Sequence, residues 1–334
     1  MSAPSSEPSR ILVDVSGSAS SREAALAAVA EHSFKHRHLF RLLGDTTEIA
    51  RGLSVFPYEA EYVETRQCDS PDEALRHAMG RILDHADTLF VSAQETRLVS
   101  AAAAESECLL PGVPVPALAA IVPTVSDDPV VQTRYSVLVD VEGQPWPEPI
   151  PGEVLIALAR PLVAWFHHRT KLRVGALTLG GGVPPTSADE RLLHALHGLT
   201  PPLVNAGALS PTDVMSGSAD LVLCRDELGA MFVRTLEATF VAAESLVRRE
   251  TQGVRGRIGV RVFRDRLEKL RDYGQVDSYG GNPLLGIRGP TVILRPDAST
   301  RAWMNAIRTA EKIRKEQLIA QQRLLLHQLG ATRA

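Results

Sequence analysis

The sequence predicts a three-layer α/β/α fold built on a mostly parallel β-sheet. Short apolar segments alternate with capped amphipathic segments along the chain, which is typical of strands followed by crossover helices. The chain has 334 residues, enough to bury a large core. Aromatic residues make up only 5% of it, so aliphatic side chains and alanine must fill the interior. We therefore expect one α/β domain over 11–330 with two lobes, preceded by a disordered polar tail at 1–10.

Short runs of aliphatic residues, ending in small or polar residues, mark the strands. Strands are expected at 11–14, 39–43, 88–92, 118–122, 137–141, 174–179, 203–205, 221–224 and 292–294. Most of these runs lack a polar alternate position, which indicates strands covered on both faces. The proline-rich stretch at 144–151 is the candidate hinge between the two lobes.

Capping residues mark the helices. Ser20 and Glu23 form a capping-box pattern, and Ser70, Pro71 and Glu73 combine an N-cap, a first-turn proline and a third-position glutamate. Helices are expected from 20, from 45, at 71–86, 98–105, 152–169, 187–198 and 229–249, and as one long helix from about 300.

Composition excludes several classes of function. The net charge is −3 and the pI about 6.4, which argues against a nucleic-acid binder. Three separated cysteines fit a reducing cytoplasm, and Cys224, at the end of a buried strand, is expected to be a packed core thiol. No apolar run is long enough to span a bilayer. We expect a cytoplasmic protein.

No cofactor or metal motif is recognisable. The sequence has no Walker A motif, and its glycine triplet at 180–182 lacks the spacing of a dinucleotide fingerprint. His194 and His197 have helical i, i+3 spacing that could ligate zinc, but no further ligand is spaced to complete a site. They are expected to be surface histidines.

Small and polar residues follow five of the predicted strands. In open parallel sheets, ligands bind outside the carboxyl ends of the strands. Each loop alone could be an ordinary βα turn, but together they form the default binding site. The candidate substrate-binding residues in these loops are Asp14, Ser16, Gly17, Ser18, Ser92, Asp140, Gly181 and Asn205.

A glycine- and proline-containing segment at 279–286 predicts a tight backbone turn against a ligand. Paired glycines can take positive φ or let a ligand lie on the main chain, and Pro283 fixes the exit of the turn. This segment adds four candidates for substrate binding, namely Tyr279, Gly280, Gly281 and Asn282.

The segment at 248–272 is rich in arginine. It holds nine basic and four acidic residues, a net charge of +5 in an otherwise acidic chain. Arg257, Arg261 and Arg264 are therefore candidates for contact with an acidic carrier protein or an anionic membrane. The alternative is a solvated helical hairpin that packs on a dimer partner.

Three segments, Ile11 to Ser18, Ser216 to Cys224 and Tyr279 to Gly286, resemble in their order and separation the PlsX family of phosphate acyltransferases. The resemblance extends from Ile11 to about Ile313. It implies an isocitrate/isopropylmalate dehydrogenase-like fold, a homodimer, and an acyl carrier protein thioester as the acyl donor. It also implies that the basic segment protrudes from the body and associates with the membrane periphery.

The loops that handle phosphate in that family differ here. The family's Asp-Ala-Met-Gly-Gly-Asp reads Asp14-Val15-Ser16-Gly17-Ser18-Ala19, and its Ser-Ala-Gly-Asn-Thr-Gly reads Ser92-Ala93-Gln94-Glu95-Thr96-Arg97. Glu95, Thr96 and Arg97 are the candidate catalytic residues. Either Arg97 holds an anion while Glu95 points away, or Glu95 acts as the base for a neutral acceptor.

The resemblance, together with the altered loops, implies an acyltransferase that moves an acyl group from an acyl carrier protein thioester to phosphate or another small nucleophile. Its altered loops suit a relative specialised to natural product biosynthesis. The alternative is a non-catalytic member of the same fold that binds carrier protein, membrane or a partner subunit.

Overall fold

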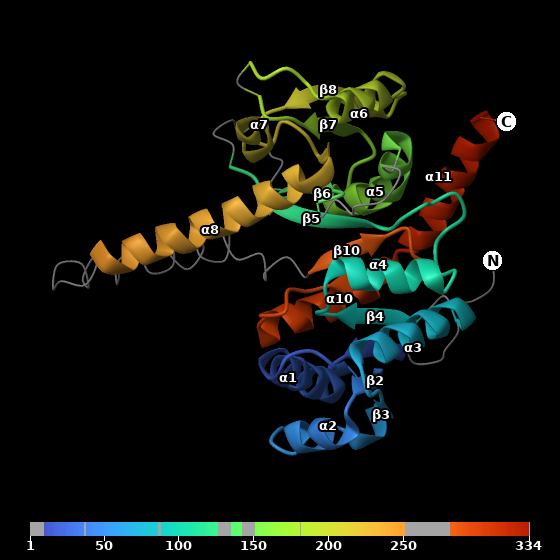
Figure 1. Ribbon diagram of the computed structural model, residues 1–334, viewed down its shortest axis with the longest axis vertical. Coiled ribbons are helices and arrows are strands. Elements are labelled where there is room, and N and C mark those ends of the chain that lie inside the picture. Colours follow the sequence, from blue (N-terminus) through green and yellow to red (C-terminus); the bar gives the residue numbers. More distant parts are fainter. Residues whose placement is uncertain are drawn as a thin grey trace. The chain divides into compact units, whose positions relative to one another are not determined.

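A computed structural model describes residues 10–36, 38–85, 88–125, 135–141, 151–180, 182–250 and 281–333 (Figure 1). The chain divides into two compact units. Unit 1 comprises residues 1–118, 146–165 and 280–334, and unit 2 comprises 119–145 and 166–279. The predicted hinge at 144–151 lies, apart from Pro151, outside the described residues and stays a prediction.

Unit 1 is built on a mostly parallel sheet with the strand order β3-β2-β1-β4-β11-β10. All neighbours in it are parallel except β10, which is antiparallel to β11. The strands are β1 (Arg10–Asp14), β2 (Leu39–Gly44), β3 (Val63–Gln67), β4 (Leu89–Ser92), β10 (Asn282–Leu285) and β11 (Thr291–Ile293). The start of β5 (Ala117–Pro123) pairs with β10, and the remainder of that strand belongs to unit 2.

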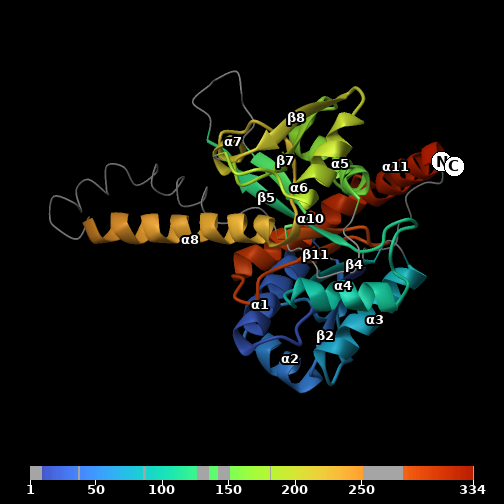
Figure 2. The same cartoon turned by 45° about the horizontal axis from the view of Figure 1, so that its top comes forward.

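Helices cover both faces of this sheet. They are α1 (Ala19–His36), α2 (Thr46–Leu53), the 3₁₀-helix η1 (Ala60–Tyr62), α3 (Pro71–Asp84), α4 (Thr96–Glu105), most of α5 (Gly152–His167), α10 (Thr300–Lys315) and α11 (Leu318–Arg333). Helix α1 packs on α10, and α3 packs on α4. Figure 2 shows the α3–α4 pair and α1 on opposite sides of β2. Trp303 of α10 is fully buried in the core.

Unit 2 has its own mixed sheet in the order β5-β6-β9-β7-β8. β5 and β6 are antiparallel, and the remaining neighbours are parallel. Its other elements are β6 (Tyr135–Val139), β7 (Leu172–Leu177), α6 (Ser187–His197), β8 (Leu203–Leu209), α7 (Pro211–Met215), β9 (Leu221–Leu223) and α8 (Asp226–Glu250). The predicted fold class, helices packed on a mostly parallel sheet, is confirmed.

An ion pair between Asp220 and Arg173 links neighbouring strands of unit 2. The Asp220 carboxylate accepts hydrogen bonds from the Arg173 backbone N–H (2.7 Å) and guanidinium (2.9 Å). The Asp220 backbone carbonyl accepts from Val137 (3.0 Å), so this residue joins β7, β9 and β6. Burial alone would raise the pKa of Asp220, but the hydrogen bonds from Arg173 outweigh it and hold the pKa below 3.8. The Ser216 to Cys224 motif therefore includes a structural carboxylate.

Four expectations about individual elements are corrected. The segment at 282–285 is strand β10 rather than part of a turn, because its backbone pairs with both β11 and β5. The C-terminal helix is two helices, α10 and α11, separated at Gln317, which has a φ of 53°. Helix α1 begins at Ala19, because the Ser18 hydroxyl rather than that of Ser20 accepts the hydrogen bond from the first turn. Strand β3 was not expected.

No helix among the described residues is long and apolar enough to cross a membrane.

Candidate functional site

Three adjacent parallel strands of unit 1 end at one edge of its sheet, and a helix follows each of them. Val13 of β1 is in register with Val91 of β4, and Ser92 is in register with Ile293 of β11. Helices α1, α4 and α10 begin a few residues after these strand ends. The first four N–H groups of a helix have no partner within that helix, and the helix dipole is positive at this end. This edge is therefore suited to an anion.

Asp14 is the centre of a hydrogen-bond network that links the loops after β1 and β4. Its Oδ1 accepts from the Ser16 backbone N–H (3.0 Å) and from the Ser16 hydroxyl (2.5 Å). Its Oδ2 accepts from the Ser92 hydroxyl (2.8 Å). The Gln94 Nε2 in turn donates to the Ser16 hydroxyl (3.2 Å), and the Gln94 backbone N–H donates to the Ser92 hydroxyl (3.1 Å). Both loops are thus held in one arrangement.

Burial determines the electrostatics of this network. Asp14 is 3% exposed and Ser92 is fully buried. Desolvation raises the pKa of Asp14 above 3.8, although the hydrogen bonds from Ser16, Ser92 and Gln94 act in the opposite direction. Because both carboxylate oxygens already accept hydrogen bonds within the protein, Asp14 is suited to positioning the two loops.

The loop residues after Ser16 lead into α1, which begins at Ala19. The Ser18 hydroxyl accepts from the Ser21 backbone N–H (3.3 Å) and lies 3.2 Å from the Ser20 hydroxyl. Gly17 lies between the Asp14 network and this cap, and is partly exposed. The structure therefore brings Asp14, Ser16, Gly17, Ser18 and Ser92 together, as the sequence predicted for strand ends at one edge.

The three candidate catalytic residues open α4. Thr96 is the first residue of this helix and is 5% exposed. Glu95 makes no hydrogen bond to the first turn; its carboxylate accepts from Arg97 Nε at 2.6 Å. The Glu95 and Arg97 side chains are 58% and 70% exposed. The pairing offsets the negative charge of Glu95 beside a helix N-terminus, which would otherwise oppose anion binding.

The loop after β11 carries a second ion pair, Arg295–Asp297, which was not among the candidates predicted from the sequence. Arg295 donates to both oxygens of Asp297, at 2.9 and 3.0 Å. The hydrogen bond from Arg295 lowers the pKa of Asp297. Ser299 then caps α10 by accepting from the Ala302 backbone N–H (3.2 Å). The signal in the sequence was the position of these residues directly after a predicted strand.

Gly281 and Asn282 lie at the same edge of the sheet. Because β10 is antiparallel to β11, its first residue, Asn282, is in register with the last residue of β11, Ile293. Gly281 is buried and has a φ of +75°, a backbone conformation that favours glycine. Their neighbours Tyr279 and Gly280 lie outside the described residues.

The remaining candidates belong to unit 2. Asp140 follows β6, is half-buried and has a φ of 65°. The strand expected to end at Asn205 continues to Leu209, so Asn205 lies within β8, where its side chain accepts from the Gly207 backbone N–H (2.7 Å) at a bulge. Gly181 lies outside the described residues. Arg257, Arg261 and Arg264 also lie outside them.

Two side-chain expectations are confirmed. Cys224 is fully buried, and burial raises the pKa of its thiol, which suits a packed core residue rather than a nucleophile. His194 and His197 are both exposed on α6.

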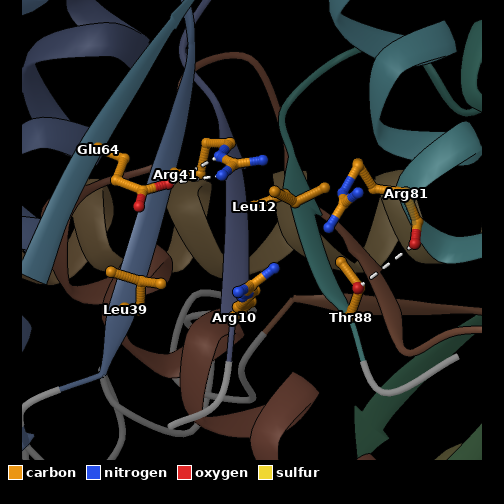
Figure 3. Close-up of a pocket in the computed structure, with 7 residues that line it drawn as sticks. All are labelled: Arg10, Leu12, Leu39, Arg41, Glu64, Arg81 and Thr88. Carbon is orange, nitrogen blue, oxygen red and sulfur yellow. Dashed lines mark hydrogen bonds and ion pairs between the residues drawn. The ribbon is translucent and has the colours of Figure 1, made fainter. Parts of the chain in front are cut away.

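Figure 3 shows a small pocket on the same sheet of unit 1, lined by residues near the amino ends of its strands and by α3. Within it Arg41 pairs with Glu64 at 2.6 Å, and the Thr88 hydroxyl points toward the Arg81 carbonyl. The lining residues are Arg10, Leu12, Leu39, Arg41, Glu64, Arg81 and Thr88. Since Asp14 ends β1 and Arg10 begins it, this pocket and the Asp14 network lie toward opposite ends of the strand.

Known structures share this fold. A branched-chain phosphotransacylase from Enterococcus faecalis aligns over 91% of this chain and 98% of its own, with a TM-score of 0.56 and 12% identity. A phosphotransacetylase from Staphylococcus aureus aligns over 95% and 94%, with a TM-score of 0.53 and 12% identity. At this identity the likeness concerns the fold alone.

Sequence comparison identifies the family. The family model described as fatty acid synthesis protein matches residues 10–321. The phosphate acyltransferase of Shewanella amazonensis is 30% identical over 307 residues, which are 83% of this chain and 84% of that protein. The phosphate acyltransferase of Gloeobacter violaceus is 26% identical over 244 residues, 71% and 69% of the two chains. The chain therefore belongs to the fatty acid synthesis protein family, together with relatives named phosphate acyltransferase.

Proposed function

We propose that this acyltransferase moves an acyl group from an acyl carrier protein thioester to inorganic phosphate and so forms an acyl phosphate. The observation that carries the proposal is the meeting of three helix N-termini, those of α1, α4 and α10, at the edge of the sheet where Asp14 holds two loops together. The names of the relatives favour phosphate as the acceptor. The family description favours a donor from fatty acid synthesis.

The reaction needs an oriented nucleophile and stabilisation of the developing oxyanion. An oxygen of hydrogen phosphate forms a bond to the thioester carbonyl carbon, and the carbon–sulfur bond breaks. The proton of the phosphate passes to the departing thiolate, so the products are the acyl phosphate and the free carrier thiol. No cofactor is required for this balance.

Each candidate side chain has a role in this proposal. Asp14, through Ser16 and Ser92, fixes the loops so that main-chain N–H groups face the phosphate. Arg97 contacts the anion, and Glu95 orients the guanidinium beside the start of α4. Thr96, at the first position of that helix, supplies a backbone donor and a hydroxyl. Gly281 and Asn282, at the same edge of the sheet of unit 1, remain candidates for contact with the acyl donor.

The experiment measures carrier deacylation by mass spectrometry, with and without phosphate. Purified protein is mixed with acyl carrier proteins that bear short, medium or long saturated chains. Hydroxylamine is added only after the carrier protein has been removed by filtration, so that it converts acyl phosphate to a hydroxamate without cleaving the thioester directly. We expect free carrier thiol and hydroxamate in equal amounts, and only when phosphate is present. The coenzyme A thioester of the same acyl chain serves as the comparison donor.

Variants separate the possible outcomes. Arg97→Ala should lower turnover and raise the KM for phosphate, whereas Glu95→Gln should keep most of the activity. If deacylation is independent of phosphate and is lost in Glu95→Gln, the acceptor is another nucleophile and Glu95 is its base. If no donor is deacylated while a carrier protein still binds, the protein is a binding module.

A further inference from the structure

Three side chains with metal-ligand chemistry meet in unit 1, at a distance from the Asp14 network. His32 lies on α1, His38 directly precedes β2, and Glu311 lies on α10. The Nε2 of His38 is 2.8 Å from Oε1 of Glu311, and the Nε2 of His32 is 3.4 Å from the same oxygen. All three ligand atoms lie within 4.8 Å of one another.

We propose that His32, His38 and Glu311 form a binding site for a divalent transition metal ion, and that zinc matches it best. Zinc binds imidazole nitrogen and carboxylate oxygen at about 2.0–2.2 Å. Ligand atoms in a tetrahedral zinc site are therefore roughly 3.3 Å apart. The two nitrogen–oxygen distances lie on either side of that value, and all three ligand atoms lie within 4.8 Å of one another.

The surroundings hold the ligands in place. The His32 side chain is 1% exposed, whereas those of His38 and Glu311 are 25% and 20% exposed. The His32 ring stacks on the His38 ring at 5.5 Å, and the buried Phe40 meets His32 edge-on at 5.7 Å. The site is thus closed on the His32 side and accessible on the other, where a water molecule can supply a fourth ligand.

The position of the cluster indicates its role. His38 directly precedes Leu39, which is in register with Arg10, whereas Asp14 is in register with Leu43. Leu39 and Leu43 are four residues apart on β2, so these two register positions are separated by roughly 13 Å along the strand. A metal ion here would not touch an acyl donor at the carboxyl edge. It would join α1, β2 and α10, two of which begin at the candidate active site.

The experiment uses the full-length protein, stripped of metal with a chelator and then titrated with zinc alone. Bound zinc is counted by mass spectrometry of the desalted protein, and the Tm is recorded with and without zinc. Cobalt is used as a spectroscopic probe, because a tetrahedral site gives it strong visible absorption bands. We expect one zinc ion per chain, a higher Tm with zinc, and tetrahedral cobalt bands.

Two variants and one control test the ligands. Glu311→Gln preserves the shape of the side chain, and His38→Gln replaces the most exposed ligand; each should weaken zinc binding at least tenfold and abolish the Tm shift. Circular dichroism in chelator checks that both variants are folded. The control replaces His194 and His197, an exposed histidine pair on α6, with glutamine, and should leave zinc binding unchanged.

The proposal fails if zinc neither binds nor raises the Tm, in which case the three residues are a metal-free hydrogen-bonded cluster. It also fails if both ligand variants bind zinc as tightly as the unaltered chain, or if only the α6 control loses binding.

Discussion

At the scale of single residues, Asp14 is a buried carboxylate at the end of a strand, and its hydrogen bonds hold two loops of the candidate site together. Its position at the end of an apolar strand could be predicted from the sequence, as could the presence of serines at the ends of neighbouring strands. The hydrogen bond between Asp14 and Ser92 could not be predicted, because the two residues are 78 positions apart and the parallel register of β1 with β4 brings them together. Glu95 and Arg97 are separated only by Thr96, so their ion pair forms between near neighbours in the sequence.

Replacement of Asp14 separates a positioning role from a structural one. Asp14→Asn removes a buried charge that burial makes costly, so thermal stability should be equal or slightly higher. Turnover should fall on the order of tenfold to 100-fold, because an amide donates to Ser92 where the carboxylate accepted, and the two loops shift. Thermal unfolding and steady-state kinetics measure the two effects.

Asp45→Asn is the matched control for this replacement. Asp45 caps α2 through the Thr47 and Glu48 N–H groups, and asparagine caps as well as aspartate. Both the turnover and the Tm of this control should stay near those of the unaltered chain. A parallel loss of stability and turnover in Asp14→Asn would mean that Asp14 only supports the fold.

At the scale of elements, apolar runs and caps predicted most of the strands and helices, and the misses have physical reasons. β3 has one half-buried and four exposed residues, so its sequence carries no apolar run. β10 contains proline and follows two glycines, and one of its two partners, β5, is distant in the sequence. The division between α10 and α11 falls at Gln317, which has a left-handed backbone conformation. Because this residue is neither glycine nor proline, its type gives no signal of a helix end.

Replacement of Gly281 tests how tightly the residue before β10 is packed. A Cβ at this position would lie 2.7 Å from Val292 Cγ1 and 3.1 Å from Leu294 Cδ2, and the φ of +75° is itself strained for other residues. Gly281→Ala should therefore destabilise the protein by more than the roughly 1 kcal/mol of a tolerated glycine change. The measurement is urea unfolding of the full chain.

Gly112→Ala isolates the contribution of backbone strain. Gly112 has a similar φ of +78°, but no atom lies within 4 Å of the added Cβ. The difference in unfolding free energy between the two variants measures the steric clash at Gly281. Equal losses for the two variants would show that the space around Gly281 is not tight.

The Asp220–Arg173 pair gives unit 2 a predictable dependence on pH. The folded-state pKa of Asp220 lies below 3.8, so the pair stabilises the fold above about pH 4, and this stabilisation is lost as the pH falls through the folded-state pKa. Asp220→Asn should be less stable than the unaltered chain at neutral pH, and the difference should narrow in acid. Urea unfolding over a pH series measures the difference in unfolding free energy between the two proteins. If this difference stays constant with pH, the Asp220–Arg173 pair is not the source of the pH dependence.

At the scale of the whole molecule, charge is distributed unevenly along the chain. The net charge is −3, yet residues 248–272 carry +5, so the remainder is strongly acidic. Such a basic segment attracts anionic partners over about a Debye length and loses this attraction in salt. An acidic carrier protein is the partner that the proposed reaction requires, and an anionic membrane is the alternative surface.

Charge reversal in this segment should weaken carrier binding in a salt-dependent way. Replacing Arg257, Arg261 and Arg264 with glutamate changes the net charge of the segment from +5 to −1, and affinity for an acyl carrier protein should fall roughly tenfold at low salt and much less at high salt. The control makes the same total change at the exposed Arg191, Arg308 and Arg323, and should bind nearly as the unaltered chain does. Titration of labelled carrier protein at several salt concentrations, repeated with anionic vesicles, distinguishes the two partners. Unchanged affinity for both would show that the segment is not a docking surface, whereas a loss confined to vesicles would assign it to the membrane.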